Sequence, residues 1–253
     1  MIDAHAHLTD ARFDDDRDAV IARAAAGGIE RILTCGEDVA SSERALDIAR
    51  SHPDLVRVAV GVHPHRAASC DAQAITALHR LARHRLVVAI GEIGLDLSGR
   101  SAPLDVQLRA LSMQLVLAAE LDLPVVLHMR DAAAELHAAL DREPAVRGQL
   151  HCYSEGPVEL TRWTAHGLIP SFAGTVTFAR NDRLREAAVR SDALLIETDA
   201  PYLAPEPRRV ERNEPARVRD TYERVAALRA TTVERLADET ARTAHALFGA
   251  RWE

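Results

Sequence analysis

The chain has 253 residues, of which 47% are hydrophobic, and this is enough for one large core without a second domain. Its formal net charge of −7 argues against broad nonspecific adhesion to nucleic acid, although a local basic surface stays possible. Three widely spaced cysteines indicate neither a disulfide framework nor a cysteine-ligated zinc site. Since no apolar run reaches membrane-spanning length and no secretory segment follows Met1, we expect a cytoplasmic protein without a membrane partner.

Short apolar or β-branched runs alternate with amphipathic segments along the chain. The predicted strands are residues 1–7, 31–35, 56–62, 86–93, 124–128, 148–152, 168–171 and 194–198. The predicted helices are residues 15–26, 41–51, 71–84, 104–121, 132–142, 157–166, 182–191, 215–230 and 233–248. Eight strands each followed by a helix predict the α/β class, as a single (β/α)8 TIM barrel over residues 1–253 with additional C-terminal helices.

Two histidines, His5 and His7, close the first predicted strand. Side chains two residues apart on a strand share a face, so the two imidazoles converge on one space. Two neutral imidazoles form a natural clamp for a divalent metal. In a chain with 12 histidines, two histidines at this spacing could also lie at the surface by chance. The residues at the other strand ends decide between a metal site and a chance pattern.

Ligand-type residues follow five further predicted strands. They are His63 and His65 after the third strand, Glu92 and Asp96 at the fourth, His128 with Arg130 and Asp131 at the fifth, His151 at the sixth, and Glu197 and Asp199 at the eighth. Barrel enzymes build their active sites at the carboxyl ends of the strands. Turns that only end a strand favour Gly, Asn, Asp and Ser over His. The pattern therefore predicts a metal site at this end of the barrel.

All 31 basic residues are arginine, because the sequence contains no lysine. A metal pair bridged by a carboxylated lysine is therefore excluded, and a Glu or Asp must bridge any such pair. The proline-rich segment 201–213 carries Arg208, Arg209 and Arg212. These arginines could bind phosphate in bidentate fashion, or the segment could be a solvated connection to the last helices, and the sequence leaves both open.

The motifs resemble those of the TatD-like metal-dependent deoxyribonucleases, within the amidohydrolase-like barrels. The matching segments are Asp3-Ala4-His5-Ala6-His7-Leu8, Gly61-Val62-His63-Pro64, Gly91-Glu92-Ile93-Gly94-Leu95-Asp96, 124–132, His151-Cys152-Tyr153-Ser154, 197–205 and Arg212-Asn213-Glu214-Pro215. The chain departs from the family pattern in three places. Leu97-Ser98 stands where aromatic residues are usual, and Glu155-Gly156 follows Ser154 where a glycine usually comes directly after the serine. Residues 208–211 replace the Arg-Gly-Lys of the family. The last two departures lie in loops that would meet substrate.

The resemblance implies two divalent metal ions, with Mg²⁺ favoured and Mn²⁺ or Zn²⁺ also compatible with mixed oxygen and imidazole ligands. One ion would be held by His5, His7, Glu92 and Asp199, and the other by Glu92, His128 and His151. The chemistry that we expect is hydrolysis of phosphodiesters by a metal-activated water, with Asp199 as general base at the end of the eighth strand. The resemblance implies a deoxyribonuclease, which we expect to be a monomeric 3′–5′ exonuclease. A barrel mouth accepts the end of a single DNA strand more easily than an intact duplex.

Substrate contacts are predicted at the rim of this site. They involve His63 and His65, which could instead hold the metal ligands in place from behind or only shape the rim; Arg130, which could instead pair with Asp131; and Tyr202 and Arg208. Two other functions remain open. One is an ester or amide hydrolase on the same site, such as an aminoacyl-tRNA deacylase, and the other is a metal-bound binding protein without catalysis.

Overall fold

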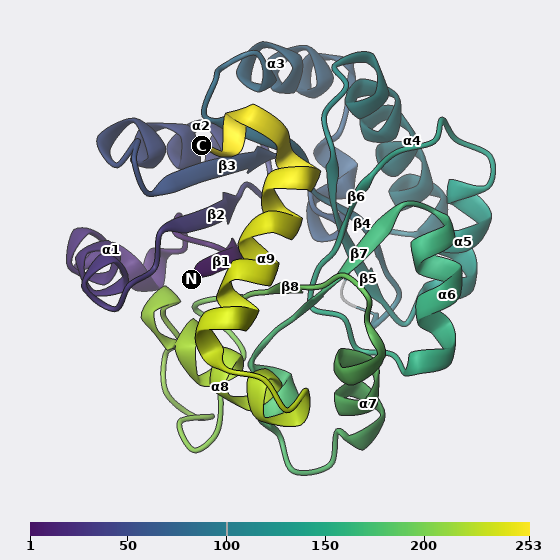
Figure 1. The fold of residues 1–253 in the computed structure, drawn as a ribbon. Helices are drawn as coiled ribbons and strands as arrows, with labels where there is room; N and C mark the ends of the chain where they lie inside the picture. The colour runs from purple at the N-terminus through teal and green to yellow at the C-terminus, as the bar shows by residue number, and fades with distance from the viewer. Residues whose placement is uncertain (100) are drawn as a thin grey trace.

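Eight parallel strands form a nearly closed barrel surrounded by helices in the computed structural model, which describes residues 1–99 and 101–253 (Figure 1). The strands are β1 (Ile2–Ala6), β2 (Arg31–Cys35), β3 (Val56–Val60), β4 (Val87–Asp96), β5 (Val125–Arg130), β6 (Gly148–Leu150), β7 (Leu168–Phe172) and β8 (Leu195–Ile196). The helices are α1 (Arg17–Ala26), α2 (Val39–Ser51), α3 (Ala72–Ala82), α4 (Leu104–Glu120), α5 (Ala133–Leu140), α6 (Pro157–Ala165), α7 (Asp182–Arg190), α8 (Val218–Leu228) and α9 (Val233–Phe248). The predicted barrel is confirmed.

Each strand pairs with the next in sequence, in the order β1 to β8, because every crossover passes through a helix on the outside of the sheet. The ring closes between β1 and the residues after β8. The His7 N–H donates to the Ala200 carbonyl over 2.7 Å, and the Asp199 N–H donates to the His5 carbonyl over 3.0 Å. Residues from the two ends of the sequence thus meet at one seam, next to the predicted metal site.

Every strand except β2 differs from its predicted bounds by one to three residues at one or both ends, and two of these differences have a clear physical cause. β4 continues to Asp96 because Gly94 and Asp96 pair with His128 and Arg130 of β5. Gly94 has φ +143°, and a Cβ there would lie 2.0 Å from the His128 carbonyl oxygen, so only glycine lets the strand pass this point. β8 ends at Ile196, before the predicted 198, because the Thr198 N–H donates to a side chain of β1 in place of the sheet.

Polar residues cap the first turns of two helices. Asp38 accepts a hydrogen bond from the Ser41 N–H over 2.7 Å at the start of α2. Asp71 accepts one from the Ala74 N–H over 2.8 Å at the start of α3. Each cap satisfies a helix N–H that would otherwise lack a partner, and contributes about 1 kcal/mol. The cap at Asp38 lets α2 begin directly after the short loop that follows β2.

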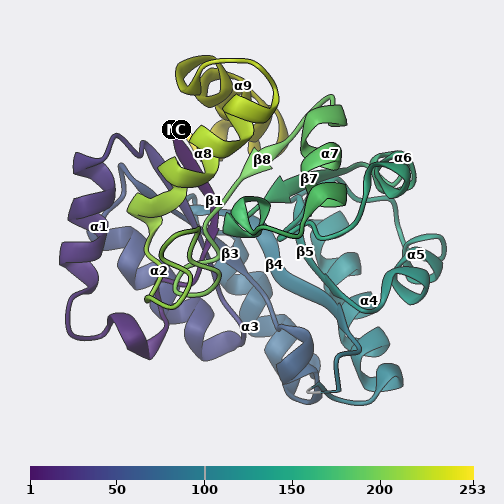
Figure 2. The same cartoon turned by 90° about the horizontal axis from the view of Figure 1, so that it is seen from below.

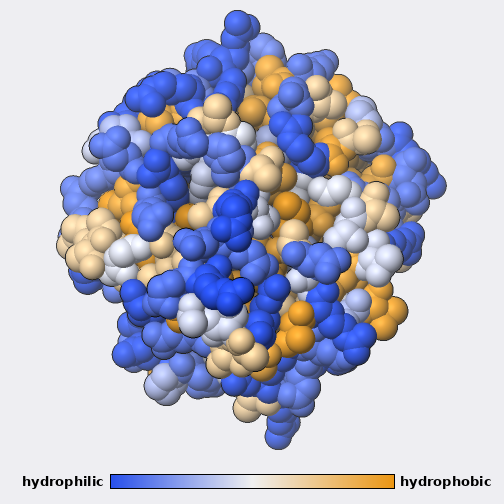
Figure 3. Space-filling model, in the orientation of Figure 1, coloured by the Kyte–Doolittle hydropathy of each residue, from blue (hydrophilic) through white to orange (hydrophobic). Residues whose placement is uncertain are grey.

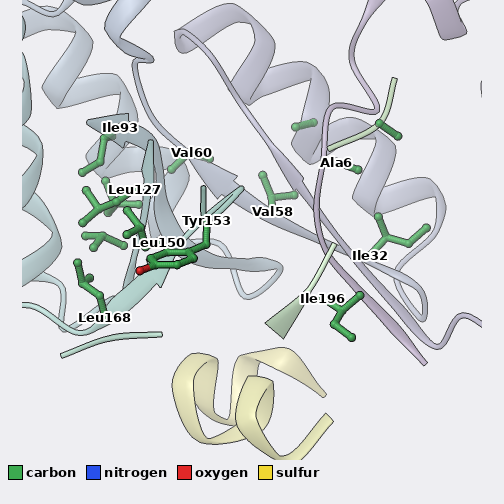
Figure 4. Close-up of a cluster of buried hydrophobic side chains, with 14 of the residues drawn as sticks. Ala6, Ile32, Val58, Val60, Ile93, Leu127, Leu150, Tyr153, Leu168 and Ile196 are labelled. Carbon is green, nitrogen blue, oxygen red and sulfur yellow. The ribbon is translucent and has the colours of Figure 1, made fainter. Parts of the chain in front are cut away.

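The main core lies between the strands and the surrounding helices. Figure 4 shows part of it, with Ile32, Val58, Leu127, Leu150 and Ile196 from five different strands. All five are buried, and burial of each aliphatic side chain of this size stabilises the fold by about 1.5–3 kcal/mol. This core makes the barrel a rigid support for the side chains at its open end.

The C-terminal segment covers the amino ends of the strands. Figures 1 and 2 show α9 beside β1 and β8, and a short 3-10 helix, η5 (Gly249–Trp252), follows it. Trp252 packs in a buried cluster with Leu33 and Val126. The Arg31 guanidinium donates to the Trp252 carbonyl over 2.9 Å, and the Arg57 guanidinium donates to the Arg251 carbonyl over 2.8 Å. One end of the barrel is therefore closed, and the chemistry lies at the other.

The surface seen from the α9 side is mostly hydrophilic, with small and separated hydrophobic patches (Figure 3). Patches of this kind are ordinary for a folded domain. Within the described residues, no helix combines the length and the apolar character that a membrane crossing requires.

Away from the barrel end, a buried histidine predicts an acid-sensitive contact between α5 and α6. His137 is 4% exposed and stacks on Trp163, with ring centroids 3.6 Å apart. Burial, together with the nearby charges of Arg162 and His166, lowers the pKa of His137 to about 4. Because the folded state favours neutral His137, its share of the stability is complete above the unfolded pKa of about 6.5 and is lost as the pH falls toward 4.

The wild-type protein should lose free energy of unfolding when the pH falls from about 7.5 to about 5. We expect this loss to be smaller by about 1–2 kcal/mol in His137→Phe, which keeps the stacking on Trp163 but cannot take up a proton. Urea unfolding at both pH values measures this difference. His245→Phe, at a half-exposed histidine of α9, is the matched control and should behave as the wild type. Equal acid losses in wild type and His137→Phe would contradict the assignment.

Candidate metal centre

Glu92, from the middle of β4, lies at the centre of the barrel's open end and is 1% exposed. One of its oxygens, Oε1, faces three imidazoles. It is 2.8 Å from His128 Nδ1, 2.8 Å from His151 Nε2 and 3.3 Å from His63 Nε2. These histidines come from β5 and from the loops after β6 and β3, so three separate strand ends direct nitrogen atoms at one carboxylate oxygen.

The other oxygen, Glu92 Oε2, faces the two histidines of the β1 end. It is 3.3 Å from His5 Nε2 and 3.4 Å from His7 Nε2. Asp199 Oδ1 completes this side, 3.4 Å from His7 Nε2 and 3.7 Å from His5 Nε2. The Glu92 carboxylate thus divides the site into two halves, each with its own oxygen and its own histidines.

All six predicted metal ligands are brought together, and His63 joins them. Three groups have ligand atoms within 4.8 Å of one another, namely His5, Glu92 and His151; His5, His7 and Asp199; and His63, Glu92 and His128. Sequence reasoning left open whether His63 supports the metal ligands, contacts substrate or only shapes the rim, and its buried side chain points at Glu92. The short turn at Pro64 aims the ring inward, and no spacing in the sequence signals that direction.

The arrangement has the features of a site built for cations. His5 Nε2 and His7 Nε2 are 3.2 Å apart, and so are His128 Nδ1 and His151 Nε2, so ring nitrogens face each other across a small space. Among the described residues, Glu92 Oε2 and His7 Nδ1 are buried without a hydrogen-bond partner. Buried polar atoms normally have partners, so converging imidazoles and an unpartnered carboxylate oxygen fit divalent metal ions. These clusters are therefore suited to binding metal.

The carboxylates are held in the charged form. Burial alone would raise the pKa of Glu92, but His151, His63 and His5 bring it well below its ordinary value. Burial would likewise raise the pKa of Asp199, but a hydrogen bond from His7 and the nearby histidine charges keep it lowered. Both groups are therefore anionic at neutral pH, which is the form that binds a metal.

Two further carboxylates fix the histidine rings from behind. His151 Nδ1 lies 3.3 Å from Glu197 Oε1, and His128 Nε2 lies 3.3 Å from Asp96 Oδ2. A carboxylate behind a ligating imidazole holds its ring and tautomer and raises its basicity. Sequence analysis noted Glu197 and Asp96 at strand ends without giving them a role, because their partners lie on other strands.

A third buried carboxylate, Asp3, joins the two sides of the seam. It accepts hydrogen bonds from the Thr198 N–H over 2.9 Å and from the Thr198 hydroxyl over 2.6 Å. Burial raises the pKa of Asp3 to about 8, against the effect of these hydrogen bonds. Asp3 belongs to the first motif of the sequence. Its hydrogen bonds to Thr198 help to place the next residue, Asp199, and the motif alone could not predict this role.

The remaining predicted substrate contacts lie at different depths around the centre. His65 is 39% exposed, and its Nε2 lies 3.0 Å from Asp96 Oδ2. Arg130 is exposed at the end of β5, and in the described part of the chain no ion pair joins it to Asp131.

Tyr202 is 42% exposed beside the centre, with its ring centroid 5.9 Å from that of His7. The Arg12 guanidinium lies over this ring at 4.1 Å, and the Tyr202 hydroxyl is 3.3 Å from Asp10 Oδ2. Arg208 instead pairs with Asp220 of α8 over 3.2 Å, so its side chain is directed at that helix.

Comparisons with known proteins identify the family. Residues 2–249 match the family model described as "TatD related DNase". The chain is 40% identical to the "3'-5' ssDNA/RNA exonuclease TatD" of Erwinia amylovora, covering 98% of this chain and all of that protein. It is 37% identical to the "Uncharacterized metal-dependent hydrolase YabD" of Bacillus subtilis, with 98% of each covered. The crystal structure of YJJV, a TatD homolog from Escherichia coli, superimposes with a TM-score of 0.92 at 28% identity, over 99% of this chain and 98% of that one. Together with the clustered His, Glu and Asp residues, these matches show that the chain is a metal-dependent hydrolase of the TatD-related DNase family.

Proposed function

We propose that this hydrolase is a two-metal 3′–5′ exonuclease that cleaves phosphodiesters at the ends of single-stranded DNA. The observation that carries the proposal is the division of the site by Glu92, whose two oxygens face separate groups of histidines. One ion would be held by His5, His7, Asp199 and Glu92, and the other by Glu92, His128 and His151, with Mg²⁺ favoured over Mn²⁺ or Zn²⁺. The names of the relatives at about 40% identity support the same activity.

When bound, two divalent ions lower the pKa of water and neutralise charge on the phosphate. Asp199 accepts the proton of the attacking water, because its carboxylate is anionic and faces the same space as His7. Glu197 and Asp96 keep the rings of His151 and His128 in place during turnover.

Substrate reaches the centre from the open end of the barrel. Tyr202 offers an exposed ring beside His7 for stacking on a base, and Arg130 offers an exposed guanidinium for a phosphate. A barrel mouth surrounded by loops admits a strand end more readily than an intact duplex.

The test is digestion of single-stranded DNA labelled at its 3′ or its 5′ end, using metal-stripped protein resupplied with Mg²⁺, Mn²⁺ or Zn²⁺. We expect immediate release of the 3′ label and gradual shortening of the 5′-labelled strand, only when metal is present. Metal-free protein is the negative control. Hydrolysis of aminoacyl esters without any cleavage of DNA would replace the nuclease by a deacylase on the same site.

A further inference from the structure

A pocket of about 390 Å³ opens between the loop after β6 and the start of α7. Its lining includes Cys152, Ser154, Thr175, Arg180, Asn181 and Arg183. Pockets of a few hundred Å³ are of the size that binds small ligands or parts of larger ones. No step of the hydrolysis described above uses it.

The pocket adjoins the metal centre through its wall at Cys152. Cys152 follows His151 directly, and its N–H donates to Glu197 Oε1 over 2.8 Å. The same Glu197 oxygen lies 3.3 Å from His151 Nδ1. One carboxylate thus holds both the pocket wall and the metal-facing imidazole. Because the pocket lies among the loops that follow β6 and β7, it is at the same end of the barrel as the metal centre.

The charge in the pocket comes from one uncommitted arginine. Arg183 pairs with Glu159 over 3.0 Å, and the carboxylate of Asp182 is neutralised by Arg185 over 2.7 Å. Arg180 is exposed and forms no ion pair with any residue of the described chain. A free guanidinium is a donor suited to a phosphate or another anion.

The other lining groups are mixed in character. The Thr175 and Ser154 hydroxyls can hydrogen-bond to a sugar or a phosphate, and the Asn181 amide N–H donates to the Thr175 carbonyl over 2.8 Å. Leu184 adds apolar surface on which the flat face of a base can lie. A lining with both polar and apolar groups suits a nucleotide, which carries both.

The outer wall depends on the loop that departs from the family pattern. A Cβ on Gly156 would lie 2.9 Å from Arg183 Nε, so the glycine lets the Arg183 side chain lie across this loop. Arg183 then reaches Glu159 on the first turn of α6. The Glu155-Gly156 segment thus lets Arg183 form part of the pocket wall. Arg180 is then the lining arginine without an ion-pair partner among the described residues.

We infer that this pocket binds the nucleotide adjoining the scissile phosphodiester, with Arg180 on its phosphate; the inference rests on the proposed nuclease function. The preferred substrate is then a chain of nucleotides, which fills both the centre and the pocket. A small phosphodiester without a neighbouring nucleotide fills the centre alone.

The test compares Arg180→Gln with Arg190→Gln. Arg190 lies at the other end of α7, is 65% exposed and pairs with Glu186, so it controls for loss of one surface charge. We measure kcat/KM for a single-stranded oligonucleotide and for bis(p-nitrophenyl) phosphate. Arg180→Gln should lower kcat/KM for the oligonucleotide about tenfold and leave the small diester unchanged. Arg190→Gln should change neither.

A binding measurement gives a readout independent of turnover. Fluorescence anisotropy of a labelled oligonucleotide on metal-free protein, over a range of salt concentrations, should give a salt slope smaller by about one for Arg180→Gln. An unchanged kcat/KM and salt slope, or equal losses on both substrates, would overturn the pocket assignment while the nuclease stands. Wild-type protein that cleaves neither phosphodiester would refute the proposed function, and the pocket assignment with it.

Discussion

Glu92→Gln is expected to lower kcat by roughly 10³-fold or more, which corresponds to about 4 kcal/mol of transition-state stabilisation. The amide has nearly the same shape but lacks the charge, and one oxygen is replaced by an NH₂ group that cannot ligate a cation. Because Oε1 faces His128 and His151 while Oε2 faces His5 and His7, both halves of the site are affected. Metal analysis measures the loss of bound ions, and steady-state kinetics measures the fall in kcat.

The matched control is Glu186→Gln, the same change on the exposed side of α7. It should keep the wild-type metal content and turnover, and circular dichroism should show both variants folded. A Glu92→Gln protein that retains two ions per chain and turns over near the wild-type rate would disprove the central role of this carboxylate.

Asp199→Asn is expected to lower kcat by about 10²- to 10³-fold at saturating metal, while ions still bind with reduced affinity. The asparagine oxygen can still ligate, but the amide cannot accept the proton that the proposed mechanism assigns to the Asp199 carboxylate. Asn also suits the backbone, since residue 199 has φ +56°, a left-handed conformation that Asn adopts more readily than most residues. The loss should therefore reflect chemistry more than misfolding.

Metal titrations of activity separate the two contributions, because weaker binding shifts the midpoint and a lost proton acceptor lowers the plateau. Asp47→Asn on the exposed face of α2 is the control and should match the wild type. A plateau that returns to the wild-type level at high metal would show that Asp199 only binds metal.

The order of strands and helices could be predicted because local periodicity and turn residues set them. The ends of β4 and β8 could not, since each depends on contacts with a distant segment. β4 extends because Gly94 passes close to the His128 carbonyl, and β8 stops because Asp3 takes the Thr198 N–H. A strand's extent therefore follows from its neighbours as well as from its own residues.

The convergence of the site residues followed from a geometric rule: parallel strands bring their carboxyl ends together. The supports behind the rings did not follow from it. Glu197 meets His151 across 46 positions of sequence, and Asp96 meets His128 across 32, so each contact is fixed by side-chain direction at strand ends. The direction of His63 toward Glu92 could not be chosen among the alternatives for the same reason.

The seam of the ring has a consequence for when activity can begin. His5 and His7 come from the first strand, while Asp199 follows the last, and these residues meet only when the hydrogen bonds between His7 and Ala200 and between Asp199 and His5 have formed. A chain in which this seam has not formed therefore lacks the complete centre, however well its other strands have paired. Hydrolysis at this site thus requires a closed ring, so activity begins only at the last stage of folding.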